Sequence, residues 1–192
     1  NRHWDVPHVI LTQDGKDHYI DTDGSFWRAI AFIESSESFD IIENLNHARE
    51  VGYALGTFHN LLRDLPVDRL ADTLEGFHIT PLYLHNYDRV LATTNVRKTH
   101  EVEYCFQFIS QRRAWAYVIE DAKVQGKLPL RTIHGDPKIN NIIIDTNTNN
   151  AIALIDLDTV KPGLIHYDLG DCLRSGCNLL GEETQEWEKV RF

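Results

Sequence analysis

A polar stretch at residues 134–141, His-Gly-Asp-Pro-Lys-Ile-Asn-Asn, constrains this chain more than any other segment. An apolar run at Leu128–Ile133 precedes it, and a second apolar run at Ile142–Asp145 follows it. A Thr/Asn-rich turn at 146–150 then leads into a third run, Ala151–Asp156. Short apolar runs bounded by turn residues are typical of buried strands. The sequence therefore predicts a polar loop held between strands, with one further carboxylate on the next strand.

The polar side chains in and after this loop suit phosphoryl transfer. Asp136 would lie where its carboxylate can orient a substrate hydroxyl, and Lys138 can offset charge on the transferring phosphoryl group. Asn141 and Asp156 offer oxygen ligands of the kind that Mg²⁺ takes in proteins. Asp158 would share a strand face with Asp156, because strand side chains alternate, and it could contact a second metal ion, the substrate or only the scaffold. The pattern predicts a base, a cation and a metal site.

The same segment also has a simpler interpretation, as a turn rich in Asp, Asn and Pro between two strands. Such turns are common. However, His134, Gly135 and Asp136, followed by Asn141 five residues after the aspartate, fix four positions at once. The carboxylate at the end of the next run adds a fifth. This combination favours the functional interpretation.

The charge and the cysteines narrow the possible functions. A formal net charge of −10 argues against nucleic acid or an anionic membrane as the main partner, and any ATP site would need local Lys, Arg and Mg²⁺. No apolar run has transmembrane length, and no signal peptide opens the chain. Cys105, Cys172 and Cys177 lack metal-ligand spacing, so we expect reduced, buried thiols. We expect a cytoplasmic protein that binds neither nucleic acid nor a membrane.

The chain divides into a β-rich part at residues 1–33, a linker at 34–40 and a helical part at 41–192. The linker is expected because its serine-rich sequence has little to bury. Asp14-Gly15 predicts a hairpin turn in the β-rich part. Three strands are expected there, at 6–12, 18–21 and 26–33.

Apolar residues at steps of three and four predict long helices in the second part. The expected helices span 41–63, 81–91 and 101–124, with further helical segments around Cys172 and at 187–192. Asp40 is the expected N-cap of the first helix, and His59, beside its apolar stripe, is expected to have a packing role. The chain has no methionine, starts with Asn1 and ends in a helix without a stop signal, so we expect an internal fragment.

These motifs resemble those of the aminoglycoside phosphotransferase and choline kinase family, which are small-molecule relatives of the protein kinases. The resemblance rests on the stretch at 134–141 and on Ile155-Asp156. Within the family, Leu154–Thr159 and Tyr167–Asp171 look most like the N-acetylhexosamine 1-kinase branch. The resemblance implies an α+β, protein-kinase-like fold. In that fold a partial small β lobe is joined by a hinge to a mainly helical lobe, which carries the catalytic loop and a β-hairpin.

The resemblance also implies roles for individual residues. Asp136 would be the catalytic base, and Asn141 and Asp156 would be the Mg²⁺ ligands. The adenine of ATP would bind the backbone of a hinge formed by Ile33, Glu34 and Ser35. Three residues would brace the catalytic segment, namely His134 within the loop and Asp168 and Asp171 at a helix start, where the helix dipole favours carboxylates.

The expected function is ATP- and Mg²⁺-dependent phosphotransfer to a hydroxyl of a small molecule, with a sugar or N-acetylhexosamine as the expected acceptor. The family's glycine-rich loop and strand lysine have no counterpart before Phe26, since Lys16 lies in a turn. We therefore expect this chain to begin after them, to lack C-terminal helices that enclose the acceptor, and to be inactive alone.

Other classes of function stay open. These are a choline- or aminoglycoside-type kinase and a non-catalytic binding module with a kinase fold. A protein kinase is disfavoured because Leu157-Asp158, not Phe-Gly, follow Asp156. A sulfatase-type hydrolase is disfavoured because no cysteine has the required neighbours.

Overall fold

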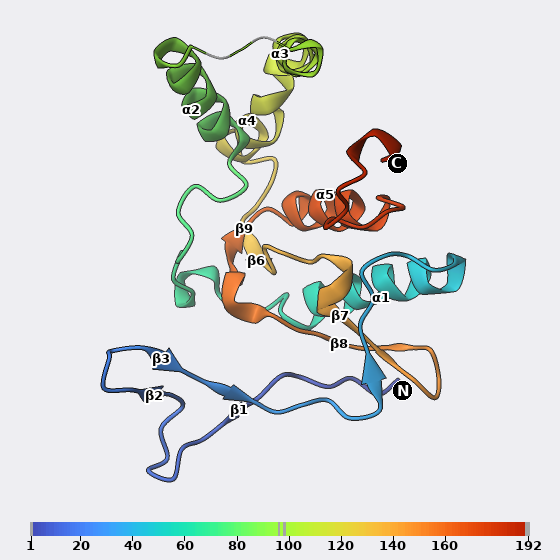
Figure 1. Cartoon of the computed structure of the whole chain (residues 1–192). Helices are drawn as coiled ribbons and strands as arrows, with labels where there is room; N and C mark the ends of the chain where they lie inside the picture. The colour runs from blue at the N-terminus through green and yellow to red at the C-terminus, as the bar shows by residue number, and fades with distance from the viewer. Residues whose placement is uncertain (1, 96, 98, 191–192) are drawn as a thin grey trace.

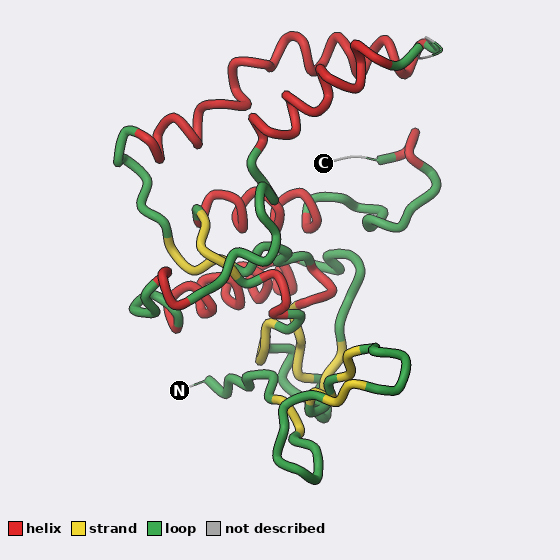
Figure 2. Tube along the Cα trace, turned by 90° about the vertical axis from the view of Figure 1, so that its left-hand side faces the viewer, coloured by secondary structure: helices red, strands yellow, loops and turns green. Residues whose placement is uncertain are grey.

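The computed structural model describes residues 2–95, 97 and 99–190. The chain forms a mixed α+β fold with three regions stacked along one axis (Figure 1). The N-terminal hairpins lie at one end and the helices α2, α3 and α4 at the other, with α1, α5 and the β7–β8 hairpin between them. A view turned by 90° keeps the same order, with most strands at one end and a long helical pair at the other (Figure 2).

The main core lies where α1 (Leu45–Leu61) packs on the β7–β8 hairpin. The strands β7 (Ile142–Asp145) and β8 (Ala151–Leu154) pair antiparallel, with Ile142 opposite Leu154. Their apolar residues meet one face of α1, which buries residues at steps of three and four, as the sequence predicts. The buried members of this core are Val51, Ala54, Leu55, Phe58, Ile139, Ile142, Ile144, Ala151, Leu154 and Cys172. The loop at 134–141 is therefore joined directly to this core, since Ile139 and Ile142 belong to it.

The segment predicted as a linker at 34–40 also contributes a short strand. β5 (Ser36–Glu37) pairs antiparallel with β7 and completes a three-stranded sheet of order β5-β7-β8. The backbone groups of these serine-rich residues find partners on the edge of β7, and such backbone pairing needs no apolar side chain. This pairing connects the segment at 34–40 to the hairpin that follows the loop at 134–141.

The N-terminal strands are shorter than predicted and pair differently. β1 (Val9–Ile10) pairs with β4 (Ala29–Ile30), and β2 (Tyr19–Ile20) pairs with β3 (Phe26–Trp27). The turn about Asp14-Gly15 is present, but it connects β1 to β2 without making them partners. Most of these side chains are exposed, so little apolar burial supports longer ladders.

Two predicted helices have different bounds. The first starts at Leu45 rather than 41, because the Asn44 side chain, not that of Asp40, caps it by accepting the His47 N–H at 2.9 Å. The helix predicted at 101–124 is broken into α3 (His100–Arg112), the 3₁₀ segment η2 (Arg113–Tyr117) and α4 (Val118–Val124). At the break, Arg113 forms a two-pronged ion pair with Asp88 of α2, so a tertiary contact overrides the local periodicity.

The remaining elements include 3₁₀ turns and a strand, β9, that the sequence did not predict. They are η1 (Val67–Arg69), α2 (Thr80–Thr93), β6 (Arg131–Ile133), η3 (Ile139–Asn141), η4 (Leu157–Thr159), β9 (Lys161–Gly163), α5 (Ile165–Gly176) and η5 (Trp187–Lys189). β6 pairs with β9. The helix expected at 187–192 is thus a single 3₁₀ turn within the described part, and residues 191 and 192 lie outside it.

Two further expectations can be compared with the structure. Only Cys172 is buried, with its thiol pKa raised to about 11 by burial, whereas Cys105 and Cys177 are exposed, so the prediction of buried thiols is wrong for two of three. All three are free. No helix in the described ranges is both long and apolar enough to cross a membrane.

Candidate active site

The loop at 134–141 leaves β6 through Gly135, whose backbone requires glycine. Its φ is +90°, a region that side chains rarely adopt, and a Cβ atom there would lie 2.6 Å from the Thr159 carbonyl oxygen. The Thr159 hydroxyl donates to the His134 carbonyl at 2.8 Å. The segment after β8 therefore packs against the start of the loop.

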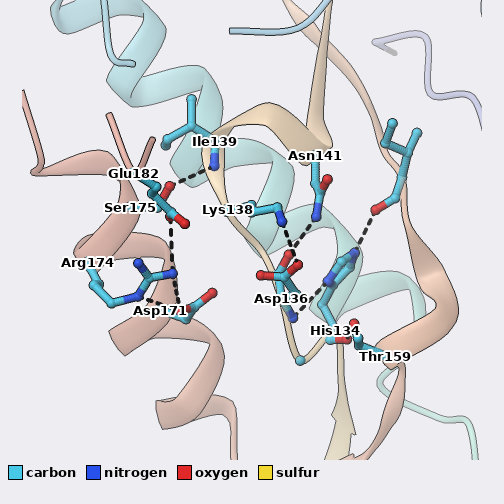
Figure 3. A network of polar contacts seen from close by, with 12 residues as sticks. His134, Asp136, Lys138, Ile139, Asn141, Thr159, Asp171, Arg174, Ser175 and Glu182 are labelled. Carbon is cyan, nitrogen blue, oxygen red and sulfur yellow. Dashed lines mark hydrogen bonds and ion pairs between the residues drawn. The ribbon is translucent and has the colours of Figure 1, made fainter. Parts of the chain in front are cut away.

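His134 is fully buried and holds the loop from within (Figure 3). Its Nδ1 accepts the Asp136 backbone N–H at 3.2 Å, so Nε2 carries the proton and donates to the Ile155 carbonyl at 2.9 Å. Burial lowers the pKa of this imidazole and keeps it neutral. A neutral ring of this one tautomer satisfies both partners.

Asp168, in the first turn of α5, binds backbone N–H groups at the start of the same loop. Its carboxylate is fully buried and accepts the N–H groups of His134 at 2.8 Å and Gly135 at 2.9 Å. The Nε2 atom of His59 lies 3.0 Å from Asp168 Oδ2, although without the angles of a hydrogen bond. His59, for which the sequence indicates only packing, therefore belongs to the support of the loop as well as contacting the Phe58 ring. Its helical spacing alone carried no signal of this long-range contact.

Asp136 and Lys138 form an ion pair on the surface of the loop. Lys138 Nζ lies 3.1 Å from Asp136 Oδ2, and both side chains are partly exposed (Figure 3). The hydrogen bond to Asp136 raises the pKa of Lys138, so the amine stays charged. The pair places a carboxylate and a fixed positive charge together where a substrate can reach them.

Asn141 and Asp156 open onto one cavity. The Asn141 side-chain N–H donates to the Asp136 backbone carbonyl at 2.8 Å, which turns its carbonyl oxygen away from the loop. Asp156 follows β8 in a left-handed conformation, with φ of 63°, and is exposed. Both residues line a cavity of about 560 Å³. One neutral and one charged oxygen at its wall suit Mg²⁺, which keeps several waters and phosphate oxygens as its other ligands.

The opposite wall of this cavity comes from the N-terminal part and the hinge. Of the three predicted hinge residues, Ile33 lines the cavity, whereas Glu34 and Ser35 do not. The Ser35 carbonyl instead accepts both the N–H and the hydroxyl of Thr146, because β5 pairs with β7 here. Ser36, which the sequence did not single out, lines the cavity in their place and donates its hydroxyl to the Ile33 carbonyl at 2.6 Å.

Two predicted supporting residues lie elsewhere than expected. Asp158 is in the 3₁₀ turn η4, not on a strand face beside Asp156, and it pairs with Arg28 across the cavity wall. Asp171 lies about one turn beyond Asp168 in α5 and pairs with Arg174 at 2.8 Å rather than with the loop (Figure 3). The loop contact comes instead from Ser175, whose hydroxyl accepts the Ile139 N–H at 3.1 Å. The spacing of seven residues from Asp168 places Ser175 on the same helix face and could have indicated it.

The site therefore brings together a loop carboxylate with a neighbouring lysine and an asparagine and an aspartate that open onto one cavity, a set of groups that could serve phosphoryl transfer. The family model of the phosphotransferase enzyme family matches residues 3–187. The chain therefore belongs to the phosphotransferase enzyme family. Membership supports phosphotransfer to small molecules as the class of activity.

The buried histidines predict how stability depends on pH. Burial lowers the pKa of His134 and of His47 in the folded state, so the unfolded chain binds more protons below its ordinary histidine pKa of about 6.5. The free energy of unfolding should therefore fall as the pH decreases from 7 to 5.5, by up to about 1.4 kcal/mol per pH unit for each histidine. Urea unfolding across this range measures it. A His47→Gln variant should show a shallower slope, and a pH-independent wild type would contradict the prediction.

Proposed function

We propose that the protein at full length is an ATP- and Mg²⁺-dependent kinase that phosphorylates a hydroxyl of a sugar or amino sugar, with N-acetylhexosamine as the first candidate. One observation carries this proposal. Asn141 is hydrogen-bonded to the Asp136 carbonyl, so the candidate base and a candidate metal ligand are held on one rigid loop. Asp156 then faces the same cavity as Asn141.

The residues would divide the reaction as follows. Asp136 would accept a hydrogen bond from the acceptor hydroxyl and hold its oxygen in line with the γ-phosphorus. The proton would pass to this carboxylate as the new O–P bond forms, while the bond between the γ-phosphorus and the β,γ-bridging oxygen breaks and ADP leaves with that electron pair. Lys138, already charged beside Asp136, would offset negative charge on the transferring group. Asn141 and Asp156 would hold Mg²⁺, which when bound shields the charge of the phosphates.

The volume and the lining of this cavity support nucleotide binding. Apolar side chains, among them Ile33, Ile143 and Ile155, form much of its wall and could sandwich an adenine ring. Arg28 also lines it but is paired with Asp158, and the chain has a net charge of −10, so bound Mg²⁺ would have to supply most of the positive charge that ATP needs.

A second candidate is a kinase that acts on a cationic acceptor such as choline or an aminoglycoside. A polar hollow of about 280 Å³ lies beside Lys138 and Asn140, and its carboxylates would attract an ammonium group. Those carboxylates belong to Asp40, Glu182 and Glu183. A neutral N-acetylhexosamine would use them as hydrogen-bond acceptors instead.

An acceptor panel tests the proposal. The full-length protein is incubated with ATP, Mg²⁺ and each of N-acetylhexosamines, hexosamines, simple sugars, choline and aminoglycosides, and the phosphorylated products are identified. We expect a sugar or amino sugar to give the highest kcat/KM and no product when EDTA removes the metal. Preference for choline or an aminoglycoside would favour the second candidate. Transfer to no acceptor would contradict both.

A further inference from the structure

Two histidines contact the peptide group between Gly135 and Asp136, one at its N–H and the other at its carbonyl oxygen. On the N–H side, His134 Nδ1 accepts from Asp136 at 3.2 Å. On the carbonyl side, His78 Nε2 lies 2.5 Å from the Gly135 oxygen. Because the carbonyl can only accept, His78 must carry a proton on Nε2. This is the peptide from which the candidate base Asp136 projects.

His78 occupies an unusual backbone position. Its φ is 64°, in the left-handed region where glycine would be the easiest residue, although His is one of the side chains that tolerate it. Its N–H donates to the Tyr83 hydroxyl at 2.7 Å, and its ring stacks on that of Tyr167 at 5.9 Å and 22°. The backbone of His78 is thus tied to α2, and its ring lies against Tyr167 of α5. His78 thus adopts a backbone conformation that favours glycine, while its side chain contacts the loop at 134–141.

The loop that carries His78 is anchored independently to the core. Lys161 on β9 is almost fully buried, and its amine donates to the Leu74 carbonyl at 2.8 Å and pairs with Asp72 at 2.6 Å. These contacts hold the segment before His78 against the β6–β9 pair that leads into the catalytic loop. The segment that carries His78 is therefore fixed relative to the β6–β9 pair.

From these contacts we propose that His78 is a positioning residue for the catalytic loop. By donating to the Gly135 carbonyl it fixes the plane of the Gly135–Asp136 peptide, and with it the direction in which the Asp136 carboxylate projects. The effect of His78 on catalysis rests on the proposed function. Its effect on the order of the loop does not.

The test compares His78→Leu, which removes the donor, with His78→Gln, whose side-chain amide can place an N–H near the position of Nε2. His85→Leu, at an exposed site on α2, is the matched control. Amide hydrogen exchange of the Asp136 N–H is followed by NMR in this chain, and kcat and KM for ATP are measured in the full-length protein. In His78→Leu, loss of this one hydrogen bond should make the Asp136 amide exchange about tenfold faster and should lower kcat about tenfold, with KM for ATP unchanged. His78→Gln should recover most of both, and His85→Leu should match the wild type.

The two readouts separate the failure of this proposal from that of the proposed function. If no acceptor is phosphorylated, faster amide exchange in His78→Leu that is reversed in His78→Gln still supports the positioning role of His78. Exchange in His78→Leu at the wild-type rate would overturn the proposal, whatever the protein phosphorylates. A His78→Gln variant that behaves like His78→Leu in exchange would overturn it as well, because a purely steric role of the ring would then suffice.

Discussion

Replacing Asp136 with asparagine is expected to lower kcat of the full-length protein by about 10²–10⁴-fold, the range found when a general base is lost. Asparagine nearly keeps the shape of the side chain but cannot accept the proton of the acceptor hydroxyl. It also removes the charge that pairs with Lys138 at 3.1 Å. The lost interactions act mainly in the transition state, so KM for ATP should change little.

The measurement is steady-state kinetics with the acceptor that gives the best turnover. Asp64→Asn makes the same chemical change at an exposed position just after α1 and should leave kcat unchanged. Lys138→Ala should cost less than Asp136→Asn, because bound Mg²⁺ would also offset phosphate charge. Full activity in Asp136→Asn would rule out the proposed role of this carboxylate.

Local sequence patterns predicted the elements whose signals are local. The run at 142–145 is a strand over the predicted residues, and the stripe through Val51 and Phe58 faces the core. The turn chemistry after Asp145 also matches, since its carboxylate accepts the N–H groups of Asn147 and Thr148. In each case the residues that determine the structure lie within a few positions of one another.

Contacts between distant segments were not predictable in the same way. The pairing of β5 with β7 joins residues more than 100 positions apart, and nothing in a serine-rich segment specifies its partner. His59 and His78 reach the catalytic loop from separate elements, and each alone reads as an ordinary helical or loop histidine. Asp158 was misplaced because β8 ends at Leu154, four residues before the position to which the alternation was extended. The roles proposed for the loop residues follow from motif spacing, whereas their support becomes visible only in three dimensions.

The second large effect is expected at Asp168. Asp168→Ala should lower the free energy of unfolding by about 3 kcal/mol or more, because it leaves the N–H groups of His134 and Gly135 buried without an acceptor, at about 1–3 kcal/mol each. The variant also leaves a void in a fully buried site. Urea unfolding at pH 7 measures the loss, with Asp64→Ala as the exposed control.

Asp168→Asn refines this test because it keeps the volume of the side chain. Its amide has one acceptor oxygen for two N–H donors, so one donor must face an NH₂ group. We therefore expect a loss intermediate between the wild type and Asp168→Ala, together with faster exchange of the Gly135 amide. Unchanged stability in both variants would show that the two N–H groups find other partners and that α5 does not hold the catalytic loop. A stability loss in Asp168→Ala that Asp168→Asn fully restores would instead assign the effect to packing, since the asparagine fills the site without replacing both hydrogen bonds.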